Sequence, residues 1–501
     1  MPKADTFQDL SLSPPPNDQD LWRWLYTELR AAILDGRLKA GTRIPSTRSL
    51  ADQYQLSRGT VVTAFDQLQA EGYTSTEVGS GTYVTLGLPD RALKTIPARN
   101  TPNLPPSKAK VSKRIRIMLK GVEVLPTSHS IGKAFRSFEP AIDLFPTELW
   151  ARVAARVLRH APRSLYGHGS ATGYQPLRRV IAEYIGSSRG VHCTSEQIVV
   201  TSGAQQALDL ISRLLLDPGD QVWMEDPGYS GAWQTLRAAG ARIVPVPIDN
   251  EGLNVTAARK LAPQAKLAYC TPANQFPLGI TMSAERRVEL LHWASTAGAW
   301  IVEDEYDAEY RYFGRPVAAL QSLDQSSSVI YVGTFTKMLF NALRIGFLVL
   351  PPRLVEVFEA ARSFVDRHPP TLDQAILAEF ISEGHFHLHV RKMRQTYAER
   401  MSVLKESALT HLSDQLDVVS AAAGMRTIAW LKTQKTQKTR ISDKTAAERA
   451  TKLGLEVLPL SAFALKHATK PALILGFASC NPAELRRGIS VLATALRTST
   501  N

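Results

Sequence analysis

The sequence predicts two domains of different class: a small α+β module near the N-terminal end, then a larger α/β domain with a mostly parallel sheet. Three observations predict this. The chain has 501 residues, more than one ordinary domain uses. Amphipathic helical patterns and two short β-prone runs fill residues 18–86. From residue 198 onward, short apolar runs alternate with helical patterns, which is typical of parallel strands between helices.

The composition is that of a globular protein without disulfides or membrane spans. Hydrophobic residues make up 44% of the chain and charged residues 21%, as in a globular protein. The three cysteines, Cys193, Cys270 and Cys480, are far apart in sequence and give neither a disulfide framework nor a metal-ligand spacing. No apolar run has the length of a membrane span, and the first residues lack the apolar core of a signal peptide. We therefore expect a cytoplasmic protein without a membrane partner.

The net charge indicates a kind of partner. The formal charge is +13, and the sequence pI is about 9.6. Such a surplus is unusual for a metabolic enzyme and predicts binding to a polyanion.

The helical patterns of the first domain have recognisable ends. An apolar stripe on residues 21–33 stops at Gly36, which predicts the first helix. Ser46 and Ser57 stand where N-caps of a second and a third helix belong, because a serine hydroxyl accepts a free backbone N–H there.

A hairpin follows these helices. Two β-prone runs, 73–78 and 82–86, flank the turn Gly79-Ser80-Gly81. Three helices followed by a β-wing describe a winged helix-turn-helix. The stretch from Gly36 to Val84 closely resembles the DNA-binding domains of the GntR family.

That resemblance implies residues at double-stranded promoter DNA. It places the third helix in the major groove, and it assigns DNA contacts to Arg48, Ser57, Arg58, Thr60 and, at the wing tip, Gly79. Arginine can reach phosphates or a guanine edge, and glycine lets the backbone approach the minor groove. The alternative is that the two arginines are solvated surface charges, but the surrounding pattern favours DNA.

Residues 87–126 are Pro-rich and basic without sustained periodicity, and we interpret them as a linker. The aminotransferase-like domain predicted below would then span 127–501. Beyond residue 354, long helical patterns and a βαβ-like tail predict a smaller subdomain. The strands of the main sheet are expected at residues 198–200, 221–224, 242–246, 267–270, 300–302 and 329–332.

Polar residues follow three of these strands. Lys337 comes after the run 329–332, with Thr334, Thr336 and Arg344 around it. A lysine among hydroxyls and an arginine suits an imine with an aldehyde cofactor whose phosphate the neighbours hold.

Two further strand ends support this hypothesis. Asp304 ends the run 301–303, where its carboxylate could pair with a protonated pyridine nitrogen. Residues 201–206 contain a glycine between a strand and a helix, a geometry that offers backbone N–H groups to a phosphate. The combination resembles the pyridoxal 5'-phosphate (PLP) proteins of fold type I, including aminotransferases, from about Phe138 to Leu496.

The resemblance implies specific roles. Lys337 forms the internal aldimine, Asp304 pairs with the pyridine nitrogen, Tyr306 and Asn274 bind the ring hydroxyl, and Tyr229 stacks on the ring. The residues implied around the phosphate are Ala204, Gln205, Thr334, Thr336, Arg344 and, from a partner subunit, Tyr166. The alternative for the tyrosines is a core position, and for Asn274 a turn.

One departure concerns the arginine with which aminotransferases hold the substrate α-carboxylate. The matching position is Ile474, and Arg426 is a substitute that the sequence leaves open. The missing arginine counts against an efficient transaminase. His385, His387 and His389 alternate, but no carboxylate or cysteine completes a metal set, so we expect no metal.

A winged helix fused to an aminotransferase-like domain is the architecture of the MocR subfamily of GntR regulators. The resemblance implies a PLP-dependent transcriptional regulator, a homodimer, in which an amine or amino-acid effector or PLP itself acts at Lys337 and alters promoter binding. We expect no enzymatic activity beyond weak transaminase half-reactions. The competing hypothesis is an aminotransferase that its N-terminal module only localises.

Overall fold

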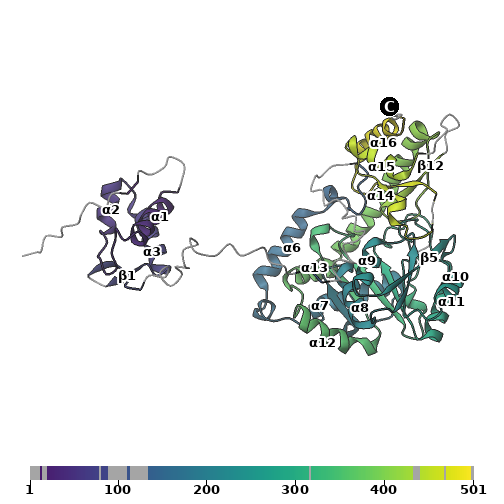
Figure 1. The fold of residues 1–501 in the computed structure, drawn as a ribbon, viewed down its shortest axis with the longest axis horizontal. Coiled ribbons are helices and arrows are strands. Elements are labelled where there is room, and N and C mark those ends of the chain that lie inside the picture. The colour runs from purple at the N-terminus through teal and green to yellow at the C-terminus, as the bar shows by residue number, and fades with distance from the viewer. Residues whose placement is uncertain are drawn as a thin grey trace, which may run out of the picture. The chain divides into compact units, whose positions relative to one another are not determined.

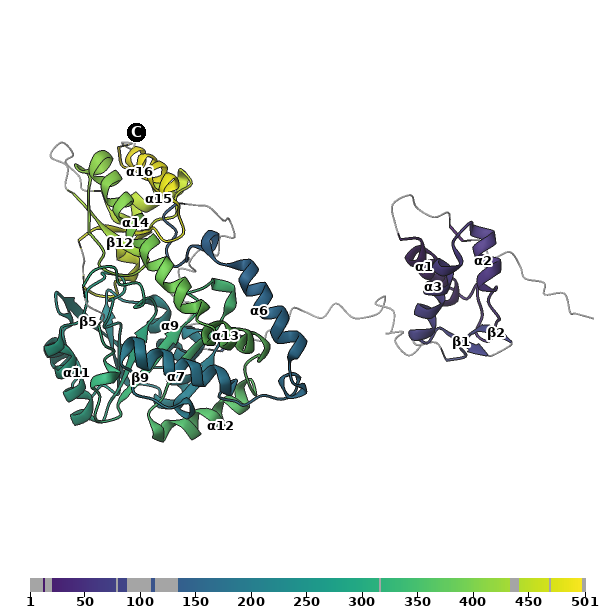
Figure 2. The same cartoon turned by 180° about the vertical axis from the view of Figure 1, so that it is seen from behind.

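The computed structural model describes residues 12–13, 20–77, 80–87, 110–112, 134–314, 317–432, 441–467 and 470–497. The chain divides into two compact units, residues 1–109 and 110–501 (Figures 1 and 2). Most of the predicted linker, 87–126, lies outside the described residues, so the predicted boundaries at 18–86 and 127–501 remain predictions.

The N-terminal unit contains, in its described part, α1 (Leu21–Leu34), α2 (Thr47–Tyr54), α3 (Arg58–Ala70), β1 (Thr74–Glu77) and β2 (Gly81–Val84). Leu25 on α1 and Val61 and Leu68 on α3 are fully buried in one core. The side chains of Ser46 and Ser57 accept backbone N–H groups and cap α2 and α3, as predicted. The two strands pair antiparallel, which completes the winged helix-turn-helix.

The C-terminal unit is built on an eight-stranded sheet with the order β3-β10-β9-β8-β7-β4-β5-β6. Pairs among β9, β8, β7, β4 and β5 are parallel, while β10 runs antiparallel between β3 and β9. The predicted mostly parallel sheet is therefore confirmed. The strands are β3 (Ile198–Thr201), β4 (Gln221–Asp226), β5 (Arg242–Asp249), β6 (Gly252–Leu253), β7 (Leu267–Cys270), β8 (Trp300–Glu305), β9 (Val329–Thr334) and β10 (Gly346–Val349).

Helices cover both faces of this sheet, because consecutive residues of its central strands are buried and point alternately to opposite sides. On β4, Val222 and Met224 pack with α8 and α9, whereas Trp223 packs with α10 and α11. The helices are α6 (Thr147–His160), α7 (Gln175–Arg189), α8 (Ala204–Leu215), α9 (Ser230–Ala238), α10 (Val255–Leu261), α11 (Ala284–Ala297), α12 (Val355–Val365) and α13 (Leu372–Ser382).

A smaller subdomain follows, as predicted, but its sheet differs from the expected βαβ tail. Its strands have the order β11-β12-β14-β13, and every pair is antiparallel, whereas a βαβ unit requires parallel neighbours. Its elements are α14 (His385–Leu412), β11 (Leu416–Val418), β12 (Arg426–Leu431), α15 (Asp443–Lys452), β13 (Leu458–Pro459), β14 (Ala472–Gly476) and α16 (Pro482–Arg497).

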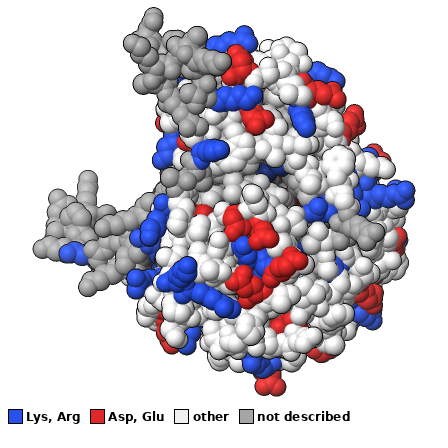
Figure 3. Space-filling model, turned by 90° about the vertical axis from the view of Figure 1, so that its right-hand side faces the viewer, with Lys and Arg blue, Asp and Glu red and all other residues white. Residues whose placement is uncertain are grey.

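Short 3-10 helices connect these elements: η2 (Ile142–Leu144), η3 (Arg163–Tyr166), η4 (Ser195–Gln197), η5 (Gln321–Leu323), η6 (Asn341–Leu343), η7 (Pro352–Leu354) and η8 (Leu460–Phe463). None of the described helices combines the length and apolar character needed to cross a bilayer. On the face in Figure 3, basic and acidic side chains of the described residues lie interspersed.

Candidate functional site

A cavity of about 570 Å³ lies where the C-terminal ends of β8 and β9 meet the N-terminal end of α8. The residues that line it are Phe138, Gly203, Ala204, Gln205, Tyr229, Tyr269, Phe276, Asp304, Tyr306, Thr334, Thr336, Lys337 and Arg344. All the predicted cofactor residues are in this lining except two. The Asn274 carbonyl accepts a hydrogen bond from Tyr306, which is in the lining, and Tyr166 lies elsewhere.

Lys337 projects from the loop after β9. Its Nζ donates to the main-chain carbonyl of Phe138 at 2.6 Å and to Asn341 Oδ1 at 3.3 Å. The side chain keeps some exposure toward the cavity, but the protein removes most of its water. This burial, followed by the charges of Arg344 and Arg426, lowers the pKa of the amine to about 8. A sizeable neutral fraction near neutral pH makes Lys337 a nucleophile toward an aldehyde.

Asp304 lies in the last part of β8 with one acceptor unused. Its Oδ2 accepts a hydrogen bond from Tyr269 Oη at 2.7 Å, while its buried Oδ1 has no partner among the described residues. Burial raises the pKa of this carboxyl to about 6. A buried acceptor without a donor fits a ligand N–H, such as that of a protonated pyridine.

The opposite side of the cavity offers donors to an anion. Gly203 has φ +103°, and a Cβ there would lie 3.2 Å from Arg344 Nη2. Arg344 donates to the Ser202 carbonyl at 2.7 Å, and the buried Thr336 hydroxyl has no partner in the described parts of the chain. Ala204 opens α8, whose first N–H groups have no intrahelical acceptor. Helix terminus, guanidinium and hydroxyl together fit a phosphate.

Aromatic rings form the walls. Tyr229 packs edge-on against Phe276, with ring centres 5.8 Å apart, and its hydroxyl lies 3.4 Å from Gln205 Oε1. Burial raises the pKa of Tyr229 to about 12, so this side chain is a neutral phenol at physiological pH. Tyr306 donates from its hydroxyl to the Asn274 carbonyl at 2.8 Å. The walls can therefore hold a flat ring between apolar surfaces.

A charged cluster lies behind the aromatic wall. Arg426, at the start of β12, donates from Nη2 to the Tyr306 hydroxyl. Its Nη1 is 3.6 Å from Asp307 Oδ2, and Asp307 Oδ1 accepts a hydrogen bond from Asn274 Nδ2 at 2.8 Å. The Asn274 side chain thus binds the Asp307 carboxylate, while its main-chain carbonyl binds the Tyr306 hydroxyl.

Sequence reasoning missed Phe138, Tyr269 and Phe276 as parts of the cavity. The position of Tyr269 could have been predicted from strand pairing. Strand β7 pairs in parallel with β8, and this places Tyr269 beside Val302, two residues before Asp304. Phe138 and Phe276 carried no such signal, since loops whose course the sequence does not reveal bring them in.

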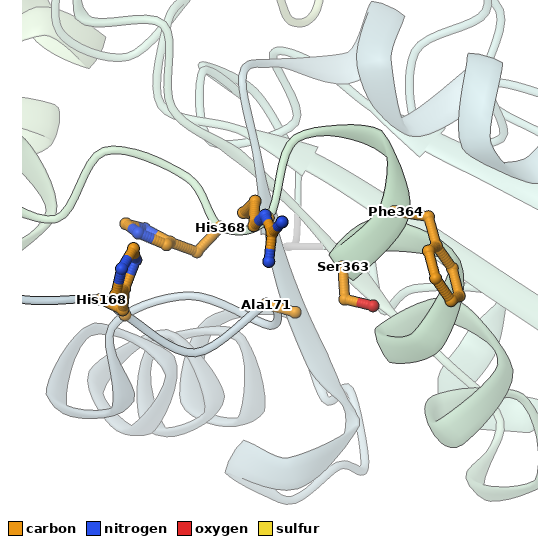
Figure 4. A pocket seen from close by; sticks show the side chains of 7 residues that line it. His168, Ala171, Ser363, Phe364 and His368 are labelled. Carbon is orange, nitrogen blue, oxygen red and sulfur yellow. The ribbon is translucent and has the colours of Figure 1, made fainter.

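Tyr166 does not reach this cavity within one chain. It ends η3, is 63% exposed, and donates from its hydroxyl to the Leu158 carbonyl at 3.3 Å. A second cavity, of about 470 Å³, lies nearby (Figure 4). His168 and His368 face each other on one side of it, while Ser363 and Phe364 project from the end of α12 on the other.

The DNA residues predicted in the N-terminal unit lie at helix starts. Arg48 on α2 and Arg58 at the first position of α3 are exposed, and neither pairs with another described residue. Thr60 donates its N–H to Ser57 Oγ at 3.1 Å, and the two hydroxyl oxygens lie 2.8 Å apart, so both side chains form the cap of α3. Gly79 lies outside the described residues.

Comparisons with known proteins agree with both halves of this arrangement. The family described as "Aminotransferase class I and II" matches residues 142–492, and "Bacterial regulatory proteins, gntR family" matches residues 23–84. The "Probable rhizopine catabolism regulatory protein MocR" of Rhizobium meliloti is 41% identical over 95% of this chain and 94% of its own. This chain belongs to the MocR subfamily of GntR-family regulators. Its predicted fold and family are thereby confirmed.

Further relatives of this MocR-type chain include regulators and enzymes. The "HTH-type pyridoxine biosynthesis transcriptional regulator PdxR" of Corynebacterium glutamicum is 29% identical over 76% of this chain and 78% of its own. A Pyrococcus horikoshii kynurenine aminotransferase superposes with TM-score 0.67 at 28% identity, covering 78% of this chain and 95% of its own. LysN of Thermus thermophilus, complexed with N-(5'-phosphopyridoxyl)-L-leucine, gives 0.66 at 28% identity over 77% and 95%.

Proposed function

We propose that this protein is a transcriptional regulator that binds promoter DNA through its N-terminal unit and responds to PLP, or to an amine that reacts at PLP, in its C-terminal unit. One observation carries this most: a winged helix-turn-helix with exposed Arg48 and Arg58 shares a chain with a cavity that is lined by the Lys337 amine and by Asp304, whose buried Oδ1 has no partner among the described residues.

The cavity residues and the adjoining Asn274 offer groups for each part of PLP. Asp304 Oδ1 would hold the ring N–H, with Tyr269 fixing the carboxylate. Tyr306 and Asn274 would hold the ring hydroxyl, and Tyr229 the ring face. The groups that would surround the phosphate are Ala204, Gln205, Thr334, Thr336 and Arg344. When bound, PLP supplies an aldehyde that bonds reversibly to primary amines and a ring that accepts electrons.

The chain's own residues set the conditions for that chemistry. Because its pKa is lowered to about 8, Lys337 is partly neutral at physiological pH and can act as a nucleophile. A cation held against Asp304 keeps this carboxylate ionised, since an adjacent positive charge opposes the effect of burial on its pKa.

The segment from residue 134 to 141 offers a route from Lys337 to the rest of the molecule. The carbonyl of Phe138 accepts the Lys337 hydrogen bond, and the carbonyl of Phe135 accepts one from Gly476 N at 3.0 Å in the small subdomain. Phe135 and Phe138 both have positive φ, 70° and 72°, a conformation that persists only where its surroundings hold it. If the Lys337 amine binds another group instead, the segment therefore loses one of the hydrogen bonds that fix it.

We propose that this release shifts the small subdomain and, through the linker, DNA affinity. A ligand can shift such an equilibrium only through its different affinity for the two states. A homodimer would present two DNA-binding units to two half-sites. Binding to promoter DNA would place the protein in the cytoplasm. In such a dimer Tyr166, exposed in one chain, would be available to the partner subunit.

The second candidate is an aminotransferase. The unpartnered Asp304 Oδ1 beside Lys337 favours it too, and "Aromatic-amino-acid aminotransferase 1" of Thermococcus litoralis is 32% identical over 76% of this chain. Purified protein loaded with PLP, incubated with amino acids and a keto acid, separates the two. The regulator gives a change in the cofactor's absorption without repeated turnover, whereas the enzyme gives steady product formation.

A further inference from the structure

The positive charge of the chain does not come from its winged helix-turn-helix. Residues 20–86, which include that whole module, contain seven Lys or Arg and seven Asp or Glu, so their formal charge is zero. The net charge of +13 therefore belongs to the rest of the chain. Because affinity for DNA depends strongly on basic groups that neutralise phosphates, the other basic residues are candidates for further DNA contacts.

Helix α6 presents a row of arginines to solvent. Three of them are four and three residues apart, a spacing that places side chains on one face of a helix, and the fourth follows at the start of η3. All four are exposed, whereas Val153 on the inner side of α6 is buried. The helix lies at the outer edge of the C-terminal unit in both Figures 1 and 2. This α6 row consists of Arg152, Arg156, Arg159 and Arg163.

Nearby acidic groups neutralise only one member of the α6 row. Arg156 donates from Nη2 to Glu383 Oε1 on α13. The other three arginines have no carboxylate partner among the described residues. Helix α6 itself contains a single acidic residue, Glu148 in its first turn. The row therefore keeps most of its charge for a partner outside the chain.

The stability of the helix does not account for this arrangement. Like charges three or four residues apart on a helix repel each other and destabilise it. The helix dipole favours Arg159, which lies in the last turn of α6, but it gives no advantage to Arg152 in the first half. A polyanion that covers the row would remove the repulsion, so such a partner explains the row better than helix stability does.

We propose that the α6 row is a second DNA-binding surface, which contacts phosphates of the duplex that the N-terminal unit binds. The inference rests on the proposed function, in which that unit binds promoter DNA. The predicted linker, residues 87–126, is long enough to let both units reach one duplex. Guanidinium groups bind phosphates through two parallel N–H donors, and contacts to phosphates carry no sequence information. The surface therefore adds affinity, while the winged helix supplies specificity.

The test compares full-length wild type with the triple variant Arg152→Gln/Arg159→Gln/Arg163→Gln. Arg156 stays, because its removal would leave Glu383 unpaired. Fluorescence anisotropy over a series of salt concentrations gives the affinity for the protein's own upstream DNA and for an unrelated duplex of equal length. We expect the variant to bind both duplexes roughly tenfold or more weakly at 0.1 M salt. The slope of log affinity against log salt concentration should decrease by about 2–3.

Two further variants separate the position of the charges from their number. Arg242→Gln/Arg259→Gln/Lys260→Gln removes three exposed charges at the start of β5 and on α10, across the unit from α6 in Figure 1. This matched control should keep the affinity and the salt slope of the wild type. Replacing the same three α6 arginines by lysine should retain most of both, because the charge remains. Thermal unfolding checks that every variant is folded.

Three results would overturn the inference. The first is an unchanged affinity and salt slope in the glutamine variant of the α6 row, and the second is an equal loss in the control. The third is a changed oligomeric state of that α6 variant in size-exclusion chromatography, which would assign the row to contacts between copies of the chain. Failure of the proposed function looks different, because the wild type would then bind its own upstream DNA no better than unrelated DNA.

Discussion

The amine of Lys337 donates a 2.6 Å hydrogen bond to the main-chain carbonyl of Phe138. This contact joins the loop after β9 to a segment that is also tied to the small subdomain, because Glu456 N donates to the Ala134 carbonyl at 3.0 Å. The state of one amine can therefore influence a segment that touches both halves of the C-terminal unit. The proposed regulation depends on this relationship.

The proposed contact of Arg58 with DNA gives the first prediction. Replacing Arg58 by alanine should weaken binding to the protein's own upstream DNA by roughly 1–3 kcal/mol, because an exposed guanidinium at the start of α3 is lost. Fluorescence anisotropy at fixed salt measures it, and PLP absorption should not change. Arg37→Ala is the control, since Arg37 lies in the same unit with its guanidinium 3.8 Å from Asp35. An equal loss in both variants would mean that only net charge matters.

The pH dependence of PLP uptake gives the second. The protein lowers the pKa of Lys337 from 10.5 to about 8, so the amine is protonated below pH 8 and neutral above it. Only the neutral amine attacks an aldehyde, and the uptake rate should therefore rise with pH and level off just above 8. Stopped-flow absorbance follows it. A rate still climbing steeply at pH 10 would show that Lys337 keeps its ordinary pKa.

Asp304 gives the third. Its folded-state pKa, about 6, lies above the ordinary 3.8, so its charge costs stability above pH 6, and this cost vanishes below pH 3.8. Asp304→Asn should therefore stabilise the cofactor-free protein at pH 7.5, by roughly 1–3 kcal/mol. The same variant should lose most of the stabilisation that PLP gives to the wild type. Thermal unfolding with and without PLP measures both effects, and a destabilised cofactor-free variant contradicts the account.

Gly203 gives the fourth. Alanine there requires φ +103° and places a Cβ 3.2 Å from Arg344 Nη2, so PLP affinity should fall. Gly219→Ala is a close control, because Gly219 has φ +102° with nothing within 4 Å of an added Cβ. Both variants should lose similar stability, and only Gly203→Ala should bind PLP more weakly in an absorbance titration. Equal PLP affinity in the two would remove Gly203 from the phosphate site.

The fold and much of the cavity could be predicted because they depend on local patterns. Asp304 lies near the end of one buried strand and Lys337 follows the next, and the ends of parallel strands meet at one sheet edge, so their meeting could be expected. Arg426 could not be assigned, since its position depends on Asp307, more than a hundred residues earlier in the chain. Tyr166 stays a prediction because a single chain leaves it exposed.

The most direct test of the central claim compares DNA affinity of the wild type and of Lys337→Ala, each with and without PLP and with β-alanine added. Anisotropy with the protein's own upstream DNA measures affinity, and the absorption spectrum checks PLP uptake in the same samples. The account predicts that the wild type changes its affinity with PLP or with the amine, whereas Lys337→Ala binds DNA but does not respond. Equal responses in both proteins, or no response in the wild type despite PLP uptake, would contradict it.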